Sequence, residues 1–147
     1  MPKQYSGMRM SLLYPDSWSI TEDTPGQPRQ GISLESPGGS FLSINLLEGD
    51  QEGEEVVRLA YEAMTAEYED IESEPLTLQI SGDDFAGVIQ RFYYLDFVIV
   101  SKLIAVPSED GVYLIQIQGE DRDIEQQSLV FEAILTSMLR SLAEGKM

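Results

Sequence analysis

Hydrophobic and polar residues alternate along much of this chain, which is the pattern of β-strands with one buried face. The first alternation runs through Met8, Met10 and Leu12. Extended structure resumes after a turn over Tyr14–Trp18, and six further strands are predicted at Gly31–Glu35, Phe41–Leu47, Leu76–Ile80, Phe85–Phe92 with a continuation through Phe97, Val98–Val106 and Val112–Gln118. Short turns rich in Gly, Pro and Asp separate neighbouring strands, so we expect antiparallel pairing.

Two other segments have helical spacing. The first begins at Glu54 and reaches about Glu69, and its apolar face consists of Val56, Val57, Leu59, Ala60, Tyr61, Ala63, Met64 and Tyr68. Glu72–Pro75 is expected to end this unit. The second helix is expected from about Ile124 to Leu142, capped by Asp121 or Asp123, with an apolar stripe of Ile124, Val130, Phe131, Ile134, Leu135, Met138, Leu139 and Leu142. These elements predict an α+β fold, a central antiparallel sheet of about six to seven strands flanked by helices. The 147 residues fit a single domain, 1–147.

Short motifs distributed along the chain resemble one known fold. Tyr14-Pro15-Asp16-Ser17-Trp18 is similar to the YP-x-x-W opening of the PsbP-like fold, and the hairpin at Ser36-Pro37-Gly38 with Phe41–Leu47 is similar to its second unit. Phe131–Met138 resembles its closing F-x-x-I-L-x-S-F helix, with Met138 where an aromatic residue is usual. The resemblance implies an α/β/α sandwich without a shared active site. Members include a photosystem extrinsic subunit, a small Ran-binding import factor, bacterial type VI effector chaperones and bacterial proteins of unknown function, so it also implies a role in binding another protein.

The charge balance limits the classes of partner. The chain has 26 Asp and Glu against nine Lys and Arg, a net charge of −17. Such a protein is repelled by nucleic-acid backbones and by anionic membrane surfaces, because both are polyanions. The expected partner is therefore another protein, possibly a basic one, with no nucleic acid and no membrane. The sequence contains no signal-peptide pattern and no long apolar run, so a cytoplasmic location is expected.

The absence of Cys and His removes several chemistries. A Cys nucleophile, a thiolate metal site, a Ser-His-Asp triad and an imidazole base are all excluded. A Ser-Lys pair is conceivable at Ser101 and Lys102, but adjacent strand residues point to opposite faces and cannot easily touch. Asp83 and Asp84 are read as turn residues. We therefore expect no enzyme activity, no catalytic residue, no cofactor and no metal.

One acidic motif has the spacing of a calcium loop. Asp121, Asp123, Glu125 and Glu132 occupy its positions 1, 3, 5 and 12. Position 6, which normally needs Gly, is Gln126, and the segment also has helical character. The favoured interpretation is the start of a helix with acidic residues in its first turn.

The remaining candidates are aromatic and acidic residues that suit a binding surface. Phe92, Tyr93 and Tyr94 follow one another on a strand, so that Phe92 and Tyr94 share one face and Tyr93 has the other. Whichever of them is not core is the predicted anchor for a partner. Glu67 and Glu69 lie in an acidic block, 48–74. The block is a solvated helix face, a rim that attracts a basic partner, or a weak collector of divalent cations. Trp18 is expected to be a core residue.

These observations predict a non-catalytic protein-binding, chaperone or adaptor domain. Two alternatives stay open. A small-ligand carrier would need an apolar pocket between the sheet and a helix, and a carboxylate-based, metal-dependent enzyme would need acids on facing strands.

Overall fold

A computed structural model describes residues 2–22 and 30–144 of the chain. Its main sheet has seven antiparallel strands in the order β3-β4-β5-β9-β8-β7-β6, and a separate two-stranded sheet pairs β1 with β2. The strands are β1 Lys3–Gly7, β2 Met10–Tyr14, β3 Ser19–Glu22, β4 Gln30–Glu35, β5 Phe41–Glu48, β6 Glu72–Ile80, β7 Asp83–Tyr94, β8 Phe97–Ser108 and β9 Gly111–Glu120. The helices are α1 Gly53–Glu67, α2 Asp121–Gln126 and α3 Ser128–Glu144. The predicted α+β class and its antiparallel sheet are confirmed.

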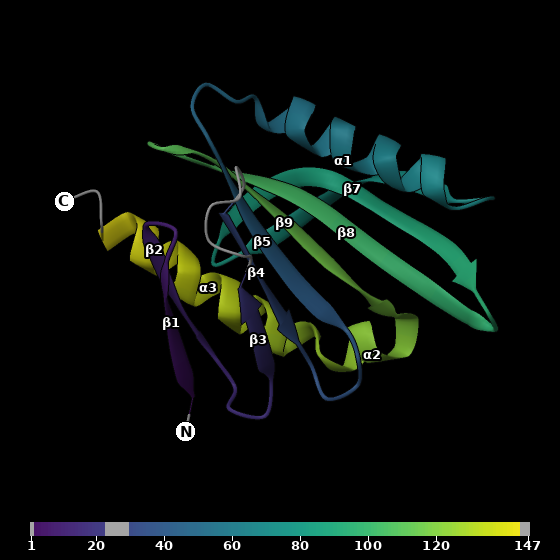
Figure 1. Ribbon diagram of the computed structural model, residues 1–147, viewed down its shortest axis with the longest axis horizontal. Helices are drawn as coiled ribbons and strands as arrows, with labels where there is room; N and C mark the ends of the chain where they lie inside the picture. The colour runs from purple at the N-terminus through teal and green to yellow at the C-terminus, as the bar shows by residue number, and fades with distance from the viewer. Residues whose placement is uncertain (1, 23–29, 145–147) are drawn as a thin grey trace.

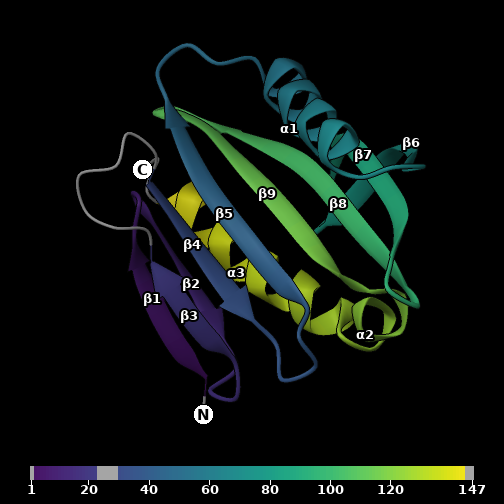
Figure 2. The ribbon, with the colours of Figure 1, turned by 45° about the vertical axis from the view of Figure 1, so that its right-hand side comes forward.

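The sheet lies between two helical layers (Figure 1). α1 covers β7, β8 and β9 on one face, and α2, α3 and the β1–β2 hairpin lie on the other. Figure 2 shows the resulting sandwich, with α1 and α3 on opposite sides of the sheet. No helix in the described part of the chain is both long enough and apolar enough to cross a membrane.

The main core fills the space between the sheet and α3. Alternate residues of the central strands point into it, among them Ile44, Ile104 and Ile115, which face one another in adjacent strands. Trp18 is buried there and meets the ring of Phe131 edge to face, with centroids 5.2 Å apart. Trp18 is therefore the core residue that the sequence predicts.

The N-terminal hairpin differs from the sequence prediction. The sequence predicts one strand beginning at Met8, but Met8 and Arg9 form the turn between β1 and β2, both with positive φ. The preceding residues 3–7 pair with β2 and have too few apolar side chains to show a strand pattern.

The segment from Glu72 to Pro75 also differs from its prediction, because it begins β6 instead of ending a helical unit. Because β6 is an edge strand, the missing N–H of Pro75 can face outward without breaking a ladder bond.

The helix predictions need two corrections. α1 buries Val56 and Val57, whereas Leu59 and Ala63, predicted on the same face, are exposed. Only a narrow stripe of α1 is therefore covered by the sheet. The C-terminal helix is split at Gln127 into α2 and α3, and its N-cap is Glu120 without a side-chain cap hydrogen bond.

Candidate functional site

The β7–β8 hairpin carries the predicted aromatic residues at its tip. Its register places Tyr94 opposite Phe97, Tyr93 opposite Val98 and Phe92 opposite Ile99. Strand alternation directs Phe92 and Tyr94 to the face covered by α1, and Tyr93 to the opposite face. Leu95 lies in the turn with φ 56°. The predicted continuous strand through Phe97 is thus two strands with a tight turn between them.

Four large apolar side chains are exposed together at this turn. Tyr93 is 77% exposed, Tyr94 57%, Leu95 78% and Phe97 53%. They account for four of the seven exposed large hydrophobic side chains in the described part of the chain. We call these four residues the aromatic tip. Exposed apolar side chains that are concentrated at one end of a hairpin are typical of interaction sites.

Phe92 does not belong to this exposed set. It is 3% exposed and stacks on Tyr68, with ring centroids 4.2 Å apart and planes at 25°. Tyr68 follows the last turn of α1, so the end of that helix covers Phe92. Of the three predicted anchors, Phe92 is the core member, and Tyr93 and Tyr94 are on the surface. Leu95 and Phe97 are not among the three anchors that the sequence predicts, although an apolar Leu between two strands is a usable signal.

A concave surface lies beside the aromatic tip on the α1 face of the sheet. We call it the aromatic groove. Its volume is about 550 Å³, and its lining consists of Gly38, Gly39, Phe41, Tyr68, Phe92, Tyr94, Phe97, Ile99, Gln118, Gly119 and Glu120. The residues come from the ends of four strands, the β4–β5 turn and the end of α1. The groove is hydrophobic along its walls, and among the residues that the structure describes Glu120 is the one acidic residue in its lining.

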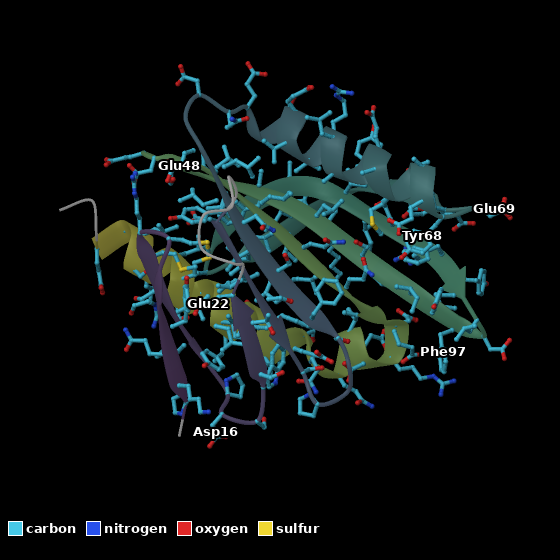
Figure 3. The ribbon with its side chains drawn as sticks, in the orientation of Figure 1. Asp16, Glu22, Glu48, Tyr68, Glu69 and Phe97 are labelled. Atoms are coloured by element: carbon cyan, nitrogen blue, oxygen red, sulfur yellow. The ribbon has the colours of Figure 1, made fainter. Side chains whose placement is uncertain are left out.

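The predicted acidic rim lies at the same end of the molecule. Glu67 is the last residue of α1, and Glu69 follows Tyr68. Figure 3 shows Tyr68, Glu69 and Phe97 at the end of the molecule where the β7–β8 hairpin turns. Asp96 adds a carboxylate within the turn itself. The topology therefore brings the predicted aromatic and acidic candidates into one region.

The calcium-loop motif is not arranged as a loop. Asp121 and Asp123 lie in the first turn of α2, and Glu132 is on α3. Asp123 accepts a hydrogen bond of 3.1 Å from Ser36 Oγ and thereby holds the β4–β5 turn against α2. Nowhere in the described ranges do three acidic side chains come together as a divalent cation would require.

Ser101 and Lys102 point to opposite faces of β8. Ser101 is buried under α1, where Gln116 Nε2 donates a hydrogen bond of 3.1 Å to its hydroxyl. Lys102 points to the α3 side, and burial, with the nearby Arg91, lowers the pKa of its ammonium group. The two side chains do not form a nucleophile–base pair. Asp83 and Asp84 begin β7 at a hairpin, as exposed residues.

The carrier hypothesis requires an apolar space between the sheet and a helix. One such space lies between β6, β8, β9 and the two C-terminal helices, and its volume is about 140 Å³. A groove of about 610 Å³ also lies between α1 and the strands β7 and β8. Cavities that bind drug-sized ligands measure roughly 300–1,000 Å³. A larger groove of about 790 Å³ lies outside the sandwich, between β2 and the outer side of α3. It is an open surface between two elements, not a pocket under a helix.

Comparisons with known proteins identify the fold. No family model matches the sequence, and no curated protein matches it. The chain is similar to a crystal structure from Bacteroides thetaiotaomicron, with a TM-score of 0.62 and 13% identity over 92% of this chain and 47% of that one. It therefore spans about half the length of the Bacteroides protein. It is also similar to the solution structure of cyanobacterial PsbP (CyanoP) from Synechocystis, with a TM-score of 0.61 and 12% identity over 92% of this chain and 90% of that one. The chain therefore has a PsbP-like fold, as the sequence motifs indicate.

Proposed function

We propose that this chain is a non-catalytic binding domain whose contact surface for another protein is the aromatic tip. The observation that carries the proposal is the exposure of Tyr93, Tyr94, Leu95 and Phe97 at the turn and on the two faces of one hairpin. Leaving these side chains in water is unfavourable, and covering them with a partner recovers roughly 25 cal/mol for each Å² of apolar surface. Aromatic residues are also enriched among the few interface positions that dominate binding energy.

The position of the tip suits an interface. A two-residue turn between long paired strands is held by backbone pairing, so its backbone loses little conformational freedom on binding. Tyr93 and Tyr94 point to opposite faces of the hairpin. A partner that closes around the tip therefore contacts both faces, and the turn residue Leu95 lies at the centre of the contact.

The charge of the surroundings favours a basic partner. Glu67, Glu69 and Asp96 lie around the tip, in a protein with a net charge of −17. Complementary charge at the rim of an interface mainly increases the association rate and selects among partners. The acidic rim thus attracts a basic protein, and the aromatic tip holds it. A location in the cytoplasm stays a prediction.

Differential affinity capture tests this function. The wild-type chain, the Tyr93→Ser/Leu95→Ser variant and the control variant Leu59→Ser are immobilised and exposed to native lysate of the source organism. Leu59 is an exposed apolar residue on α1, outside the aromatic tip. We expect a basic protein to be retained by the wild type and by the control and lost from the tip variant.

Measurement of the captured protein's affinity completes the test. A hot-spot loss of about 2 kcal/mol or more corresponds to roughly 30-fold weaker binding by the tip variant. The control should bind within twofold of the wild type. Equal affinity of the tip variant and the wild type would refute the proposal.

A further inference from the structure

The aromatic groove combines ring surfaces and a carboxylate in one concave site. Five of its lining residues are aromatic, namely Phe41, Tyr68, Phe92, Tyr94 and Phe97. The strand register explains why Glu120 joins them. Phe92 pairs with Ile99, and Ile99 pairs with Glu120, so these three side chains point to the same face of the sheet. Phe92, Ile99 and Glu120 thus form a row across β7, β8 and β9, with Phe92 at one end and Glu120 at the other.

The carboxylate of Glu120 is not neutralised within the described part of the chain. The ion pairs found there join Arg9 to Glu48 and Asp110, Arg58 to Glu55 and Glu62, and Arg91 to Glu74. Glu120 takes part in none of them. Glu120 is partly buried and lines the groove. A cation that enters the groove would be attracted by the carboxylate of Glu120.

Aromatic faces add a second attraction for cations. The face of an aromatic ring carries partial negative charge, and an ammonium or guanidinium group within about 6 Å of its centre is attracted. A neutral apolar ligand would gain from the rings but not from Glu120, and an anion would be repelled by Glu120 and by the net charge of −17. The set of lining groups therefore selects organic cations.

We propose that the aromatic groove binds the charged end of an arginine or lysine side chain carried by a basic protein segment. The proposal rests on the proposed function, since the groove adjoins the aromatic tip and shares Tyr94 and Phe97 with it. The tip covers apolar surface of the partner, and the groove receives one of its cationic side chains. The partner should therefore carry a positively charged side chain at the position that faces the aromatic groove.

A titration with small probes tests the groove without any partner. Amide resonances of the full chain are followed by NMR as N-acetyl-arginine methylamide, N-acetyl-lysine methylamide and N-acetyl-citrulline methylamide are added. Citrulline has the shape of arginine without its charge. We expect saturable shifts at Phe97, Ile99, Gln118 and Glu120 with arginine or lysine, and at least tenfold weaker binding of citrulline.

Two variants locate the effect. Glu120→Gln and Phe97→Leu should each weaken binding of the cationic probes at least fivefold, and both replace partly exposed side chains by residues of similar size. The matched control Glu109→Gln removes a charge from the β8–β9 turn, outside the groove, and should leave binding unchanged. Equal binding of citrulline, or binding that Glu120→Gln leaves unchanged, would overturn the proposal.

The two proposals fail in different ways. Tyr93 and Leu95, the residues changed in the capture experiment, do not line the groove. Probes that fail to bind, together with a tip variant that still loses its partner, overturn only the cation site. Probes that bind, together with a tip variant that keeps its partner, overturn the proposed function and leave the cation site standing.

Discussion

Phe92 and Tyr94 are two residues apart on the same face of β7, yet only Phe92 is buried. The difference arises from the end of α1. The helix stops at Glu67, and the ring of Tyr68 comes to rest on Phe92. Side chains two positions apart on a strand are separated by roughly 7 Å, so Tyr94 lies beyond the reach of the helix. One residue is thereby a core residue and the other a surface anchor.

This difference predicts contrasting stabilities. Phe92→Ala should lower the free energy of unfolding by about 3–5 kcal/mol, because it leaves a cavity beneath Tyr68. Tyr94→Ala, on the exposed part of the same strand face, should change it by no more than about 0.5 kcal/mol. Urea denaturation of both variants measures the two effects. Similar losses for both would show that the tip is part of the core.

Lys102 gives a prediction that depends on pH. Burial lowers its pKa below the ordinary value of 10.5, Arg91 adds to this, and Asp121 partly opposes it. The folded protein therefore carries the proton on Lys102 at a cost in stability at neutral pH. As pH rises through the lowered pKa toward 10.5, the unfolded chain binds more protons than the folded one, and this cost disappears.

Replacement of Lys102 by Met should therefore raise the Tm by a few degrees at pH 7. The gain should shrink when both proteins are compared at about pH 10, where the wild-type amine is losing its proton. Arg140→Met, on the C-terminal helix, serves as a control for loss of a positive charge. A gain that is the same at both pH values would contradict the assignment to the Lys102 ammonium group.

At the scale of elements, β2 is attached to α3 by two serine side chains. Ser141 Oγ accepts a hydrogen bond of 2.9 Å from the backbone N–H of Ser11, and Ser137 Oγ accepts one of the same length from Leu13. The two serines are four residues apart, on one face of the helix. They thus satisfy backbone donors along the side of β2 that faces away from β1, where the described residues provide no second strand.

Removal of these hydroxyl groups should loosen the N-terminal hairpin. Ser137→Ala and Ser141→Ala should each cost about 1 kcal/mol in the free energy of unfolding. Hydrogen exchange of the Ser11 and Leu13 amides should accelerate in the corresponding variant. Thr136→Ala, a neighbouring position on the same helix, is the control. If the Ser11 and Leu13 amides exchange as slowly in the variants as in the wild type, the serine hydroxyl groups do not hold the hairpin in place.

Most elements of the fold could be predicted because their own residues, through hydrophobic spacing or turn-forming pairs, favour the conformation that they adopt in the structure. The Asp110-Gly111 turn is an example. Gly111 has φ 147°, and a Cβ there would lie 2.1 Å from the carbonyl oxygen of Leu47, so the hairpin requires Gly. β1 could not be predicted, since its residues are held by pairing with β2 and not by an apolar pattern of their own.

The candidate site could be predicted only in part, for a related reason. Alternation correctly separated Tyr93 from Phe92 and Tyr94, but the choice between Phe92 and Tyr94 depends on where α1 ends in space. Glu120 and Phe41 come from strands far away in sequence, and only the sheet order β5-β9-β8-β7 brings them to the same groove. No local pattern contains that information.

At the scale of the whole molecule, the net charge of −17 should make stability depend on salt. Excess negative charges repel one another more strongly in the compact state than in the unfolded chain. Salt screens this repulsion over a Debye length of about 10 Å at 0.1 M. The Tm should therefore rise as sodium chloride increases from low to moderate concentration. A flat or falling curve would indicate that local ion pairs such as those of Arg58 already compensate the acidic side chains.

The central claim is that the aromatic tip contacts another protein in the cell. Site-specific photo-crosslinking tests it most directly, with a benzophenone amino acid in place of Leu95 and, in separate variants, in place of Leu59 and Leu129. All three residues are exposed leucines, but only Leu95 belongs to the tip. After irradiation of intact cells, we predict a discrete crosslinked product from position 95 that is absent from positions 59 and 129. No product from position 95, or the same product from all three positions, would contradict the assignment of the tip as the contact surface.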